Sequence, residues 1–488
     1  MNPFAQWDLK YVWHPFTQMR DWLRREPIVI VAGRGAELRD ARGRKFLDAN
    51  ASIWTNLHGH RHPKINAAIS RQLKKIAHSS ALGLANEPAS MLARKLVAAA
   101  NPPASTFHPR LSKVFFSDDG STALEVALKL AYEFTRRERK IPKPKFLSLA
   151  GAYHGDTVGA VSLGHIELFH AAYGGLLFPS DQAMAPYCYR CPFNRAPPER
   201  ADARVYRRCH WECVGAVEKK FAGRRKKGSP YAAFVFEPRI QGAAGMIPQP
   251  RGWLNQVSQI ARAHGALLIA DEVMTGFGRT GVSSFPNAAS DGRPAERENP
   301  KRELLFACHQ EGVQPDFLCL AKGLTGGYLP MAATLTTPAV FNAFLGEYHE
   351  FKTFFHGHSY TGNQLGASAA LASLEILQSV ASIRARAALE KNLGEELQTL
   401  WRLPQVGDVR QVGLIAGIEL VKDWRTREPF DLRERAGIRV CEAMTRRGVL
   451  TRPIGNVIVL MPPYCTTPAQ LQKMVAALRE SIAEVWGR

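Results

Sequence analysis

The stretch Cys319-Leu-Ala-Lys-Gly-Leu-Thr-Gly-Gly-Tyr-Leu-Pro330 places one lysine, Lys322, between an apolar run and a glycine-rich turn. Residues 317–321 predict a short buried strand, and strands of this kind end at the sheet edge where α/β proteins bind ligands. An amine held at that edge can form an imine with a carbonyl compound. A strand-end lysine that simply reaches water is the more common arrangement, so residues elsewhere must distinguish the two.

Two further apolar runs, Tyr231-Ala-Ala-Phe-Val-Phe-Glu237 and Ala266-Leu-Leu-Ile-Ala-Asp-Glu272, also end in carboxylates. If all three runs are parallel strands of one sheet, they bring Glu237, Asp271 and Lys322 to the same edge. A lysine and two carboxylates on one edge suit a site that controls protons around an imine. This combination favours a chemical role for Lys322.

Glycine-containing turns could hold the phosphate and the ring of a ligand. Asp118-Asp-Gly-Ser-Thr-Ala-Leu-Glu125 opens a predicted helix, and the free amides at a helix start attract phosphate groups. Tyr153, in Gly151-Ala-Tyr-His-Gly-Asp-Thr157, can stack on a flat ring, although a packed tyrosine is common in such loops. Phe354-Phe-His-Gly-His-Ser-Tyr-Thr-Gly-Asn363 either holds an anion or caps the helix that follows.

The composition is that of a globular protein: 488 residues, 45% hydrophobic and 22% charged, are enough for a large core. The net charge of +21 raises nucleic acid or an anionic membrane as partners. Basic side chains crowd residues 200–227, however, and no nucleic-acid-binding motif accompanies them. No window approaches 18 uninterrupted apolar residues, and the first residues lack a secretion-signal pattern. We expect a cytoplasmic protein with neither nucleic acid nor membrane as partner.

The stretch 187–228 interrupts the alternation of strands and helices and contains two cysteine pairs. Its thiols are Cys188, Cys191, Cys209 and Cys213, with two and three residues between partners and 17 between the pairs. This spacing satisfies the broad pattern of a four-cysteine structural zinc or iron–sulfur site. Four unrelated thiols in a surface insertion are the alternative.

Taken together, the motifs resemble the class III aminotransferases, which use pyridoxal 5′-phosphate on the fold-type-I scaffold. The resemblance runs from Trp13-His-Pro-Phe-Thr-Gln-Met19 to Met461-Pro-Pro-Tyr464, nearly the whole chain. Three motifs occur in the family's order and spacing, namely Asp271-Glu-Val-Met-Thr-Gly-Phe-Gly-Arg-Thr-Gly281, Lys322-Gly-Leu-Thr-Gly-Gly327 and His356-Gly-His-Ser-Tyr-Thr-Gly362. The fold implied is α/β, with a mixed, mostly parallel sheet in a large domain and a small α+β domain.

We expect three segments along the chain. Residues 1–62 form an N-terminal arm and part of the small domain. Residues 63–365 form the large cofactor-binding domain, with the insertion 187–228. Residues 366–488 complete the small domain at the C-terminal end.

The resemblance assigns roles around the cofactor. Lys322 forms the Schiff base and then moves the proton between substrate and cofactor, while Asp271 pairs with the pyridine nitrogen and keeps it protonated. Tyr153 stacks on the ring. The other residues implied to surround the cofactor are Val273 on the second ring face, Gly120 and Ser121 at the phosphate, Ser359 of the neighbouring subunit at the same phosphate, and His154 and Glu237 nearby. The active unit implied is a homodimer with a shared active site.

The resemblance also implies a substrate pocket and a reaction. The pocket residues are Phe16, Trp54, Tyr153, Gly357 and Arg452, with Arg452 holding a substrate carboxylate. The reaction is transfer of an amino group to 8-amino-7-oxononanoate, giving 7,8-diaminononanoate in biotin synthesis. A class III transaminase of ω-amino acids or diamines with another acceptor is the alternative.

The amino donor is either lysine or S-adenosylmethionine. The branch that uses S-adenosylmethionine typically has a tyrosine where Phe16 stands and a second aromatic residue where Ile53 stands. A phenol missing from a polar contact weakens binding of a donor that needs it. Phe16 and Ile53, together with His358, resemble the branch that uses lysine, so we favour lysine as the donor.

Overall fold

The computed structural model describes residues 1–102, 108–282 and 303–487. Its centre is a seven-stranded sheet in the order β4-β12-β11-β10-β7-β5-β6. The strands are β4 Lys113–Ser117, β5 Lys145–Leu149, β6 Asp181–Ala183, β7 Tyr231–Phe236, β10 Leu267–Asp271, β11 Phe317–Leu320 and β12 Ala332–Thr336. Only β12 runs antiparallel to its neighbours, so the predicted mixed, mostly parallel sheet is confirmed.

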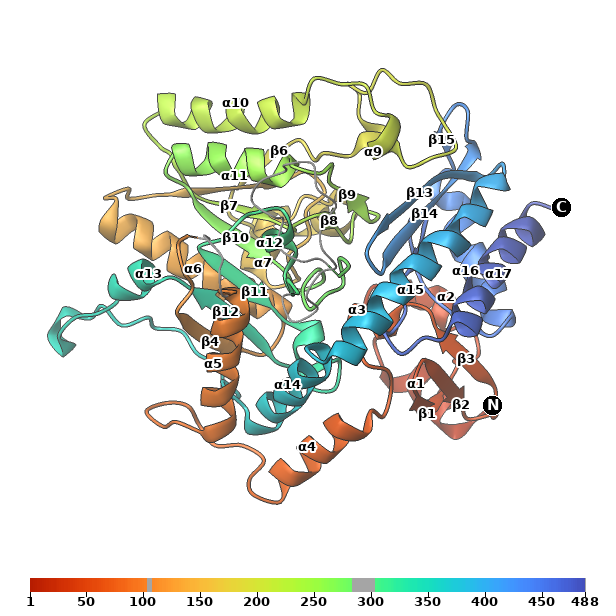
Figure 1. Cartoon of the computed structure of the whole chain (residues 1–488), viewed down its shortest axis with the longest axis horizontal. Helices are drawn as coiled ribbons and strands as arrows, with labels where there is room; N and C mark the ends of the chain where they lie inside the picture. Colours follow the sequence, from red (N-terminus) through yellow and green to blue (C-terminus); the bar gives the residue numbers. More distant parts are fainter. Residues whose placement is uncertain (103–107, 283–302, 488) are drawn as a thin grey trace.

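Helices cover both faces of this sheet, which explains why its strands are apolar without alternation. Alternate residues of β11 point to opposite faces: Phe317 and Cys319 pack in one hydrophobic cluster with helix α6 (Gly120–Glu138). Leu318 and Leu320 pack in the other cluster, with α11 (Trp253–Ala263). Figure 1 shows α11 and α10 (Glu212–Lys226) on the same side of the sheet.

The two ends of the chain build a second region (Figure 1, red and blue). A four-stranded sheet has the order β1-β2-β3-β16, so a strand from the C-terminal part completes the N-terminal sheet. The other sheet has the order β13-β14-β18-β17, with β15 pairing with β14. The strands are β1 Ile30–Arg34, β2 Glu37–Asp40, β3 Lys45–Asp48, β13 Val406–Val412, β14 Ile415–Asp423, β15 Glu428–Pro429, β16 Val449–Leu450, β17 Pro453–Ile454 and β18 Val457–Leu460. The segment boundaries at 62/63 and 365/366 stay predictions.

The longer helices of this region and of the connection to it are α4 Pro63–Leu73, α5 Glu87–Ala100, α14 Gln364–Leu377, α15 Val380–Gln398, α16 Ala436–Arg446 and α17 Pro468–Val485. The shorter elements are α1 Pro3–Tyr11, α2 Met19–Trp22, α3 Ala51–Trp54, α7 Val158–Leu163, α8 Glu167–His170, α9 Ala203–Tyr206, α12 Ala307–Gln310, α13 Pro338–Asn342, β8 Ile240–Gln241 and β9 Ile247–Pro248. Among the described helices, none by itself is long and apolar enough to cross a membrane; by length and composition alone, the bent pair Gln364–Leu377 and Val380–Arg402 passes.

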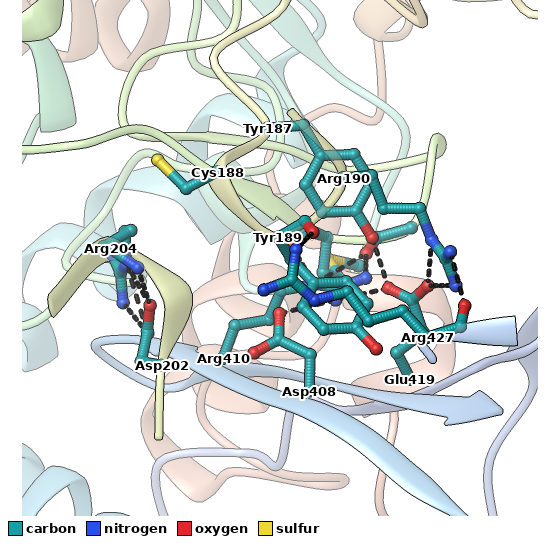
Figure 2. A network of polar contacts seen from close by, with 12 residues as sticks. Tyr187, Cys188, Tyr189, Arg190, Asp202, Arg204, Asp408, Arg410, Glu419 and Arg427 are labelled. Atoms are coloured by element: carbon teal, nitrogen blue, oxygen red, sulfur yellow. Dashed lines mark hydrogen bonds and ion pairs between the residues drawn. The ribbon is translucent and has the colours of Figure 1, made fainter. Parts of the chain in front are cut away.

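The insertion docks on the C-terminal sheet through a buried polar network (Figure 2). The guanidinium of Arg410 on β13 lies at its centre, with Nη1 3.0 Å from Asp408 Oδ2 and 2.7 Å from Glu419 Oε2. From the insertion, Arg190 Nε donates to Glu419 Oε1 at 2.7 Å, and the hydroxyl of Tyr187 donates to Glu419. Glu419 therefore has cations on both sides, whereas Asp408 shares one.

This asymmetry predicts opposite effects of neutralising the two carboxylates. Burial raises the pKa of Asp408 from 3.8 to about 7, whereas the cations beside Glu419 outweigh its burial and lower its pKa. Because the Asp408 carboxyl holds its proton more tightly when folded, its contribution to stability declines as the pH rises from about 4 to about 7 and is constant above. The wild type should lose free energy of unfolding as the pH rises from about 5 to about 8, and Asp408→Asn should escape this loss. Relative to wild type, its free energy of unfolding should therefore rise by about 2 kcal/mol over this range.

Glu419→Gln is the matched variant and should lose about 3–5 kcal/mol at both pH values, because it leaves Arg410 and Arg190 short of a charge partner. Thermal melting of the three proteins at pH 5 and pH 8 measures these differences. If Asp408→Asn lost more stability than Glu419→Gln at pH 8, Glu419 would not be the main charge partner of Arg410 and Arg190.

The predicted metal site at the four cysteines is not supported. In residues 1–102, 108–282 and 303–487, no group of three or more His, Cys, Asp and Glu side chains could hold a metal ion. Cys188 packs in a small cluster with Tyr189 and Ala203, whereas Cys213 belongs to the large core. Burial raises the pKa of Cys188 to about 12 and that of Cys213 to about 11. The alternative of unrelated thiols in a surface insertion therefore agrees better with the described residues.

Candidate active site

The carboxyl ends of three neighbouring parallel strands meet at one edge of the central sheet. In the register, Asp271 of β10 lies opposite Cys319 of β11, and Ala270 lies opposite Phe236 of β7. Glu237 directly follows β7, and Lys322 begins the 3₁₀ turn after β11. The strands thus deliver two carboxylates and an amine to a common edge, the place where open α/β sheets bind ligands.

Lys322 is held in a conformation that side chains rarely adopt. Its φ is +41°, and the turn is completed by Gly326 and Gly327, whose φ values are also positive. The amine lies 4.8 Å from the centroid of the Trp54 ring. Burial lowers the pKa of Lys322, and the charges of Asp271 and Glu237 oppose this shift only in part. A larger fraction of neutral amine favours nucleophilic attack.

The carboxylate of Asp271 is fixed by hydrogen bonds to both oxygens. His154 Nδ1 donates to Asp271 Oδ2 at 2.8 Å, and the amide of Val273 donates to Oδ1 at 3.1 Å. Asp271 and His154 are both buried; Asp271 ends β10, whereas His154 lies in the loop 151–157, 117 residues earlier in the sequence. A carboxylate held by two hydrogen bonds keeps its position at the sheet edge.

Glu237 is the second carboxylate at the edge, and its environment differs. It accepts the amide of Gly242 at 2.7 Å and that of Tyr153 at 3.3 Å. Burial raises its pKa to about 7. The hydrogen bond to Tyr153 ties the loop 151–157 to β7, so Glu237 positions this loop.

The start of α6 and the loop 151–157 are packed too closely for larger residues. A Cβ on Gly120 would lie 2.6 Å from Val273 Cγ1, and one on Gly155 would lie 2.4 Å from Ser121 Cβ. The side chain of Asp119 caps the helix. Ser121 Oγ accepts the amide of Thr157 at 3.0 Å. The helix start therefore keeps backbone amides beside Val273, where an anion is attracted by the helix dipole.

Aromatic side chains from separate segments form a wall next to this edge. The ring of Phe16 lies 6.4 Å from that of Tyr153 and 5.3 Å from that of Phe169. The hydroxyl of Tyr153 donates to Asp156 Oδ2 at 2.7 Å. Arg452 Nη2 donates to the carbonyl of Phe16 at 3.1 Å. The predicted pocket residues Phe16, Tyr153 and Arg452 are thus linked; Phe169, which the sequence analysis missed, joins them.

The predicted residues Gly357 and Ser359 lie in the loop before α14. His358 Nδ1 of this loop lies 2.9 Å from Asp118 Oδ2, next to the start of α6, and His78 Nε2 donates to the carbonyl of Ser359. Asn363 at the end of the loop accepts the amide of Gly366 and caps α14. The helix-capping alternative for this turn is therefore satisfied, and a role for Ser359 at the phosphate stays a prediction.

Comparison with known proteins places this geometry in a family. The profile of Aminotransferase class-III matches residues 19–288 and 304–482. Adenosylmethionine-8-amino-7-oxononanoate aminotransferase of Geobacter sulfurreducens is 46% identical over 481 residues, covering 99% of this chain and 97% of that protein. The chain belongs to the class III aminotransferases.

Solved structures agree with this assignment. The crystal structure of the enzyme of the same description from Methanocaldococcus jannaschii has a TM-score of 0.85 and 40% identity, covering 99% of this chain and 98% of the other. A PLP-bound amine transaminase from an uncultivated Pseudomonas species has a TM-score of 0.83 and 32% identity, covering 97% and 98%. The protein is an aminotransferase with the fold-type-I architecture, as the motifs implied.

Proposed function

We propose that this aminotransferase uses pyridoxal 5′-phosphate to transfer an amino group to 8-amino-7-oxononanoate, giving 7,8-diaminononanoate for biotin synthesis. The observation that carries the proposal is the amine of Lys322 at one sheet edge with Asp271 and Glu237. The identity of 42–46% to five relatives described as adenosylmethionine-8-amino-7-oxononanoate aminotransferases supports the acceptor over that of a general ω-amino-acid or diamine transaminase.

The residues present fit pyridoxal phosphate in their chemistry. An amine is available for its aldehyde, a charged carboxylate for its pyridine nitrogen, a phenol ring for its face, and a glycine–serine helix start for its phosphate. Because Gly120 has no Cβ, the start of this helix can pack directly against Val273, close to the site. When bound, the cofactor supplies the electron sink that stabilises negative charge on the substrate carbon.

The chain's own residues would divide the remaining work. Asp271 would keep the proton on the pyridine nitrogen, and His154 holds the Asp271 carboxylate in place for this role. Lys322 carries a proton to and from the substrate carbon as a general base and acid. Tyr153 and Val273 would cover the two faces of the ring. Arg452 would pair with the substrate carboxylate, beside a pocket wall formed by Phe16 and Trp54.

A homodimer is part of the proposal. Large apolar side chains are exposed on two segments that touch each other: Leu82 is 92% exposed and Tyr360 is 62% exposed. The rings of His78 and Tyr360 join these segments, with centroids 4.9 Å apart. Exposed apolar surface of this kind marks an interface. A second copy on this face would bring its own Ser359 and Gly357 towards the shared site.

For the amino donor, the sequence pattern and the relatives point in different directions. Phe16 and Ile53 favoured lysine, whereas the names of the relatives contain adenosylmethionine. We propose S-adenosylmethionine as the donor, because the similarity behind those names extends over 98–99% of the chain. Lysine stays the second candidate, because Phe16 packs against Tyr153 and offers no hydroxyl there.

The half-reaction of the purified holoenzyme tests the proposal. Mixing it with S-adenosylmethionine should change the visible absorption of the cofactor, and adding 8-amino-7-oxononanoate should restore it. Lysine and a generic ω-amine are run in parallel. A response to lysine but not to S-adenosylmethionine would make lysine the donor. No response to either S-adenosylmethionine or lysine would contradict the biotin-pathway assignment.

A further inference from the structure

The segment that carries Trp54 into the site has a left-handed backbone. Four consecutive non-glycine residues have positive φ: Ala51 (+44°), Ser52 (+48°), Ile53 (+61°) and Trp54 (+67°). Residues other than glycine avoid this region, and left-handed turns of several residues are rare. A conformation of this kind persists only where the surrounding structure enforces it, and such segments cluster at functional sites.

Asp48 supplies the enforcing contacts. Its carboxylate, 4% exposed, accepts the Ser52 amide on Oδ1 at 3.0 Å and the Ser52 hydroxyl on Oδ2 at 2.8 Å. His60 Nε2 lies 2.9 Å from Oδ2. The side-chain amide nitrogen of Asn56 lies 3.0 Å from His60 Nδ1 and holds the ring from its other side. The carboxylate thus accepts three hydrogen bonds that close around the turn.

The turn leads directly to the amine of the site. Beyond Ser52, Ile53 is 45% exposed, and the ring of Trp54 lies under the amine of Lys322. Among the described residues, the indole Nε1 of Trp54 has no hydrogen-bond partner, although it is buried. The other side of Trp54 is confined, because a Cβ on Gly242 would lie 3.4 Å from its Cζ3. A small rotation of the turn would therefore move the indole relative to Lys322.

The same strand end is tied to the second part of the pocket. β3, which ends at Asp48, pairs in parallel with β16, and Asp48 lies opposite Leu450. Two residues beyond Leu450 is Arg452, which is bonded to the carbonyl of Phe16. The left-handed turn and Arg452 therefore start from adjacent positions of one ladder.

We propose that Asp48 is a positioning residue of the substrate pocket, holding the left-handed turn Ala51–Trp54 so that Trp54 faces Lys322 and Ile53 stands at the rim; this rests on the function proposed above. Asp48 makes no contact with the reacting atoms itself. Its loss alters how substrates fit between Trp54 and Arg452, and it leaves the attachment of the cofactor to Lys322 intact.

The variant Asp48→Asn tests this role in the holoenzyme. The amide turns one acceptor oxygen into a donor, so either the Ser52 amide or the His60 Nε2–H loses its acceptor. We expect the donor concentration for half-saturation of the half-reaction to rise about tenfold or more, since small displacements of a binding group cost up to about 10²-fold. Cofactor content and its visible spectrum should match the wild type.

Asp40→Asn is the matched control. Asp40 ends β2 in the same sheet, is 3% exposed, and accepts the amides of Arg42 and Arg44 and the guanidinium of Arg44. Asp40→Asn should lower the stability of the protein and leave the donor concentration for half-saturation unchanged. If Asp48→Asn does not fold, Ser52→Ala removes only the hydroxyl bond to Oδ2 and should shift half-saturation in the same direction by a smaller factor.

The donors tested are S-adenosylmethionine, lysine and a generic ω-amine. Failure of wild type to react with the first two would overturn the proposed function, while the ω-amine still reports on the pocket. Equal half-saturation in Asp48→Asn and Asp40→Asn would overturn the positioning role, and so would loss of the bound cofactor in Asp48→Asn.

Discussion

Lys322→Ala is expected to lower turnover by about 10³-fold or more, the largest effect of any single substitution in this chain. The variant loses both the amine that attaches the cofactor and the group that carries the proton, and proton transfer by one positioned group is itself worth about 10²–10⁴-fold. The structure explains the size of this effect: the amine is buried beside the ring of Trp54, and the charges of Asp271 and Glu237 act on it. Steady-state rates and single half-reactions measure the loss.

The cofactor should still bind to Lys322→Ala without a covalent link. Asp271, its partner His154 and the helix start at Gly120 are unaffected by the substitution. Absorbance after gel filtration at high cofactor concentration reports this binding. Lys145→Ala serves as control, because Lys145 begins β5 at the opposite end of the sheet. More than a tenth of wild-type activity in Lys322→Ala would show that another group carries the chemistry.

The sheet edge was predictable from sequence because its cause is local. Strands buried on both faces read as uninterrupted apolar runs, and β7, β10 and β11 have this pattern. Where such a run ends in a charged residue, that residue must lie at the sheet edge. Glu237, Asp271 and Lys322 could therefore be placed together before their neighbours were known, and the parallel register confirms it.

The contacts that hold this edge could not be predicted, because they join residues distant in sequence. The hydrogen bond from His154 to Asp271 spans 117 residues, and that from Arg452 to Phe16 spans 436. Positive φ is normally predicted from glycine or asparagine. The turn from Ala51 to Trp54 contains neither residue, so its sequence does not predict a left-handed backbone. The backbone angles show the turn, and the hydrogen bonds to Asp48 explain it.

The cysteines are the opposite case: their spacing predicted a metal site, and the described residues contain no group that could hold a metal ion. Spacing between cysteines predicts a metal site only if the backbone turns the thiols towards one point. In the insertion, Cys188 is held by packing with Tyr189, while Cys209 Sγ accepts a hydrogen bond from Arg207 Nη1 at 3.0 Å. In Figure 2 the sulfur of Cys188 points away from the polar network around Arg410. Packing decided where these side chains went.

Asp271→Asn is expected to lower turnover by about 10²–10³-fold while leaving the protein folded. The asparagine has the same shape, but it carries no charge to keep a proton on the pyridine nitrogen, so the ring would lose most of its capacity to accept electrons. The amide also presents a donor to either the Val273 amide or His154 Nδ1, both of which donate to Asp271. The loss should fall on the half-reactions and only weakly on donor binding.

Asp316→Asn separates this effect from the general cost of removing a buried carboxylate. Asp316 and Asp271 are each 5% exposed, but Asp271 ends β10 whereas Asp316 directly precedes β11, at the opposite edge of the sheet, where it accepts the amide of Leu268 at 2.7 Å. Its substitution should lower the melting temperature and leave the half-reaction rate within about twofold, since the free energies of distant sites are independent. Asp271→Glu should keep part of the activity, because the charge remains while its position changes. If Asp271→Asn and Asp316→Asn proved equally active per folded molecule, the charge of Asp271 would have no part in the reaction, and the edge would owe its chemistry to Lys322 and Glu237 alone.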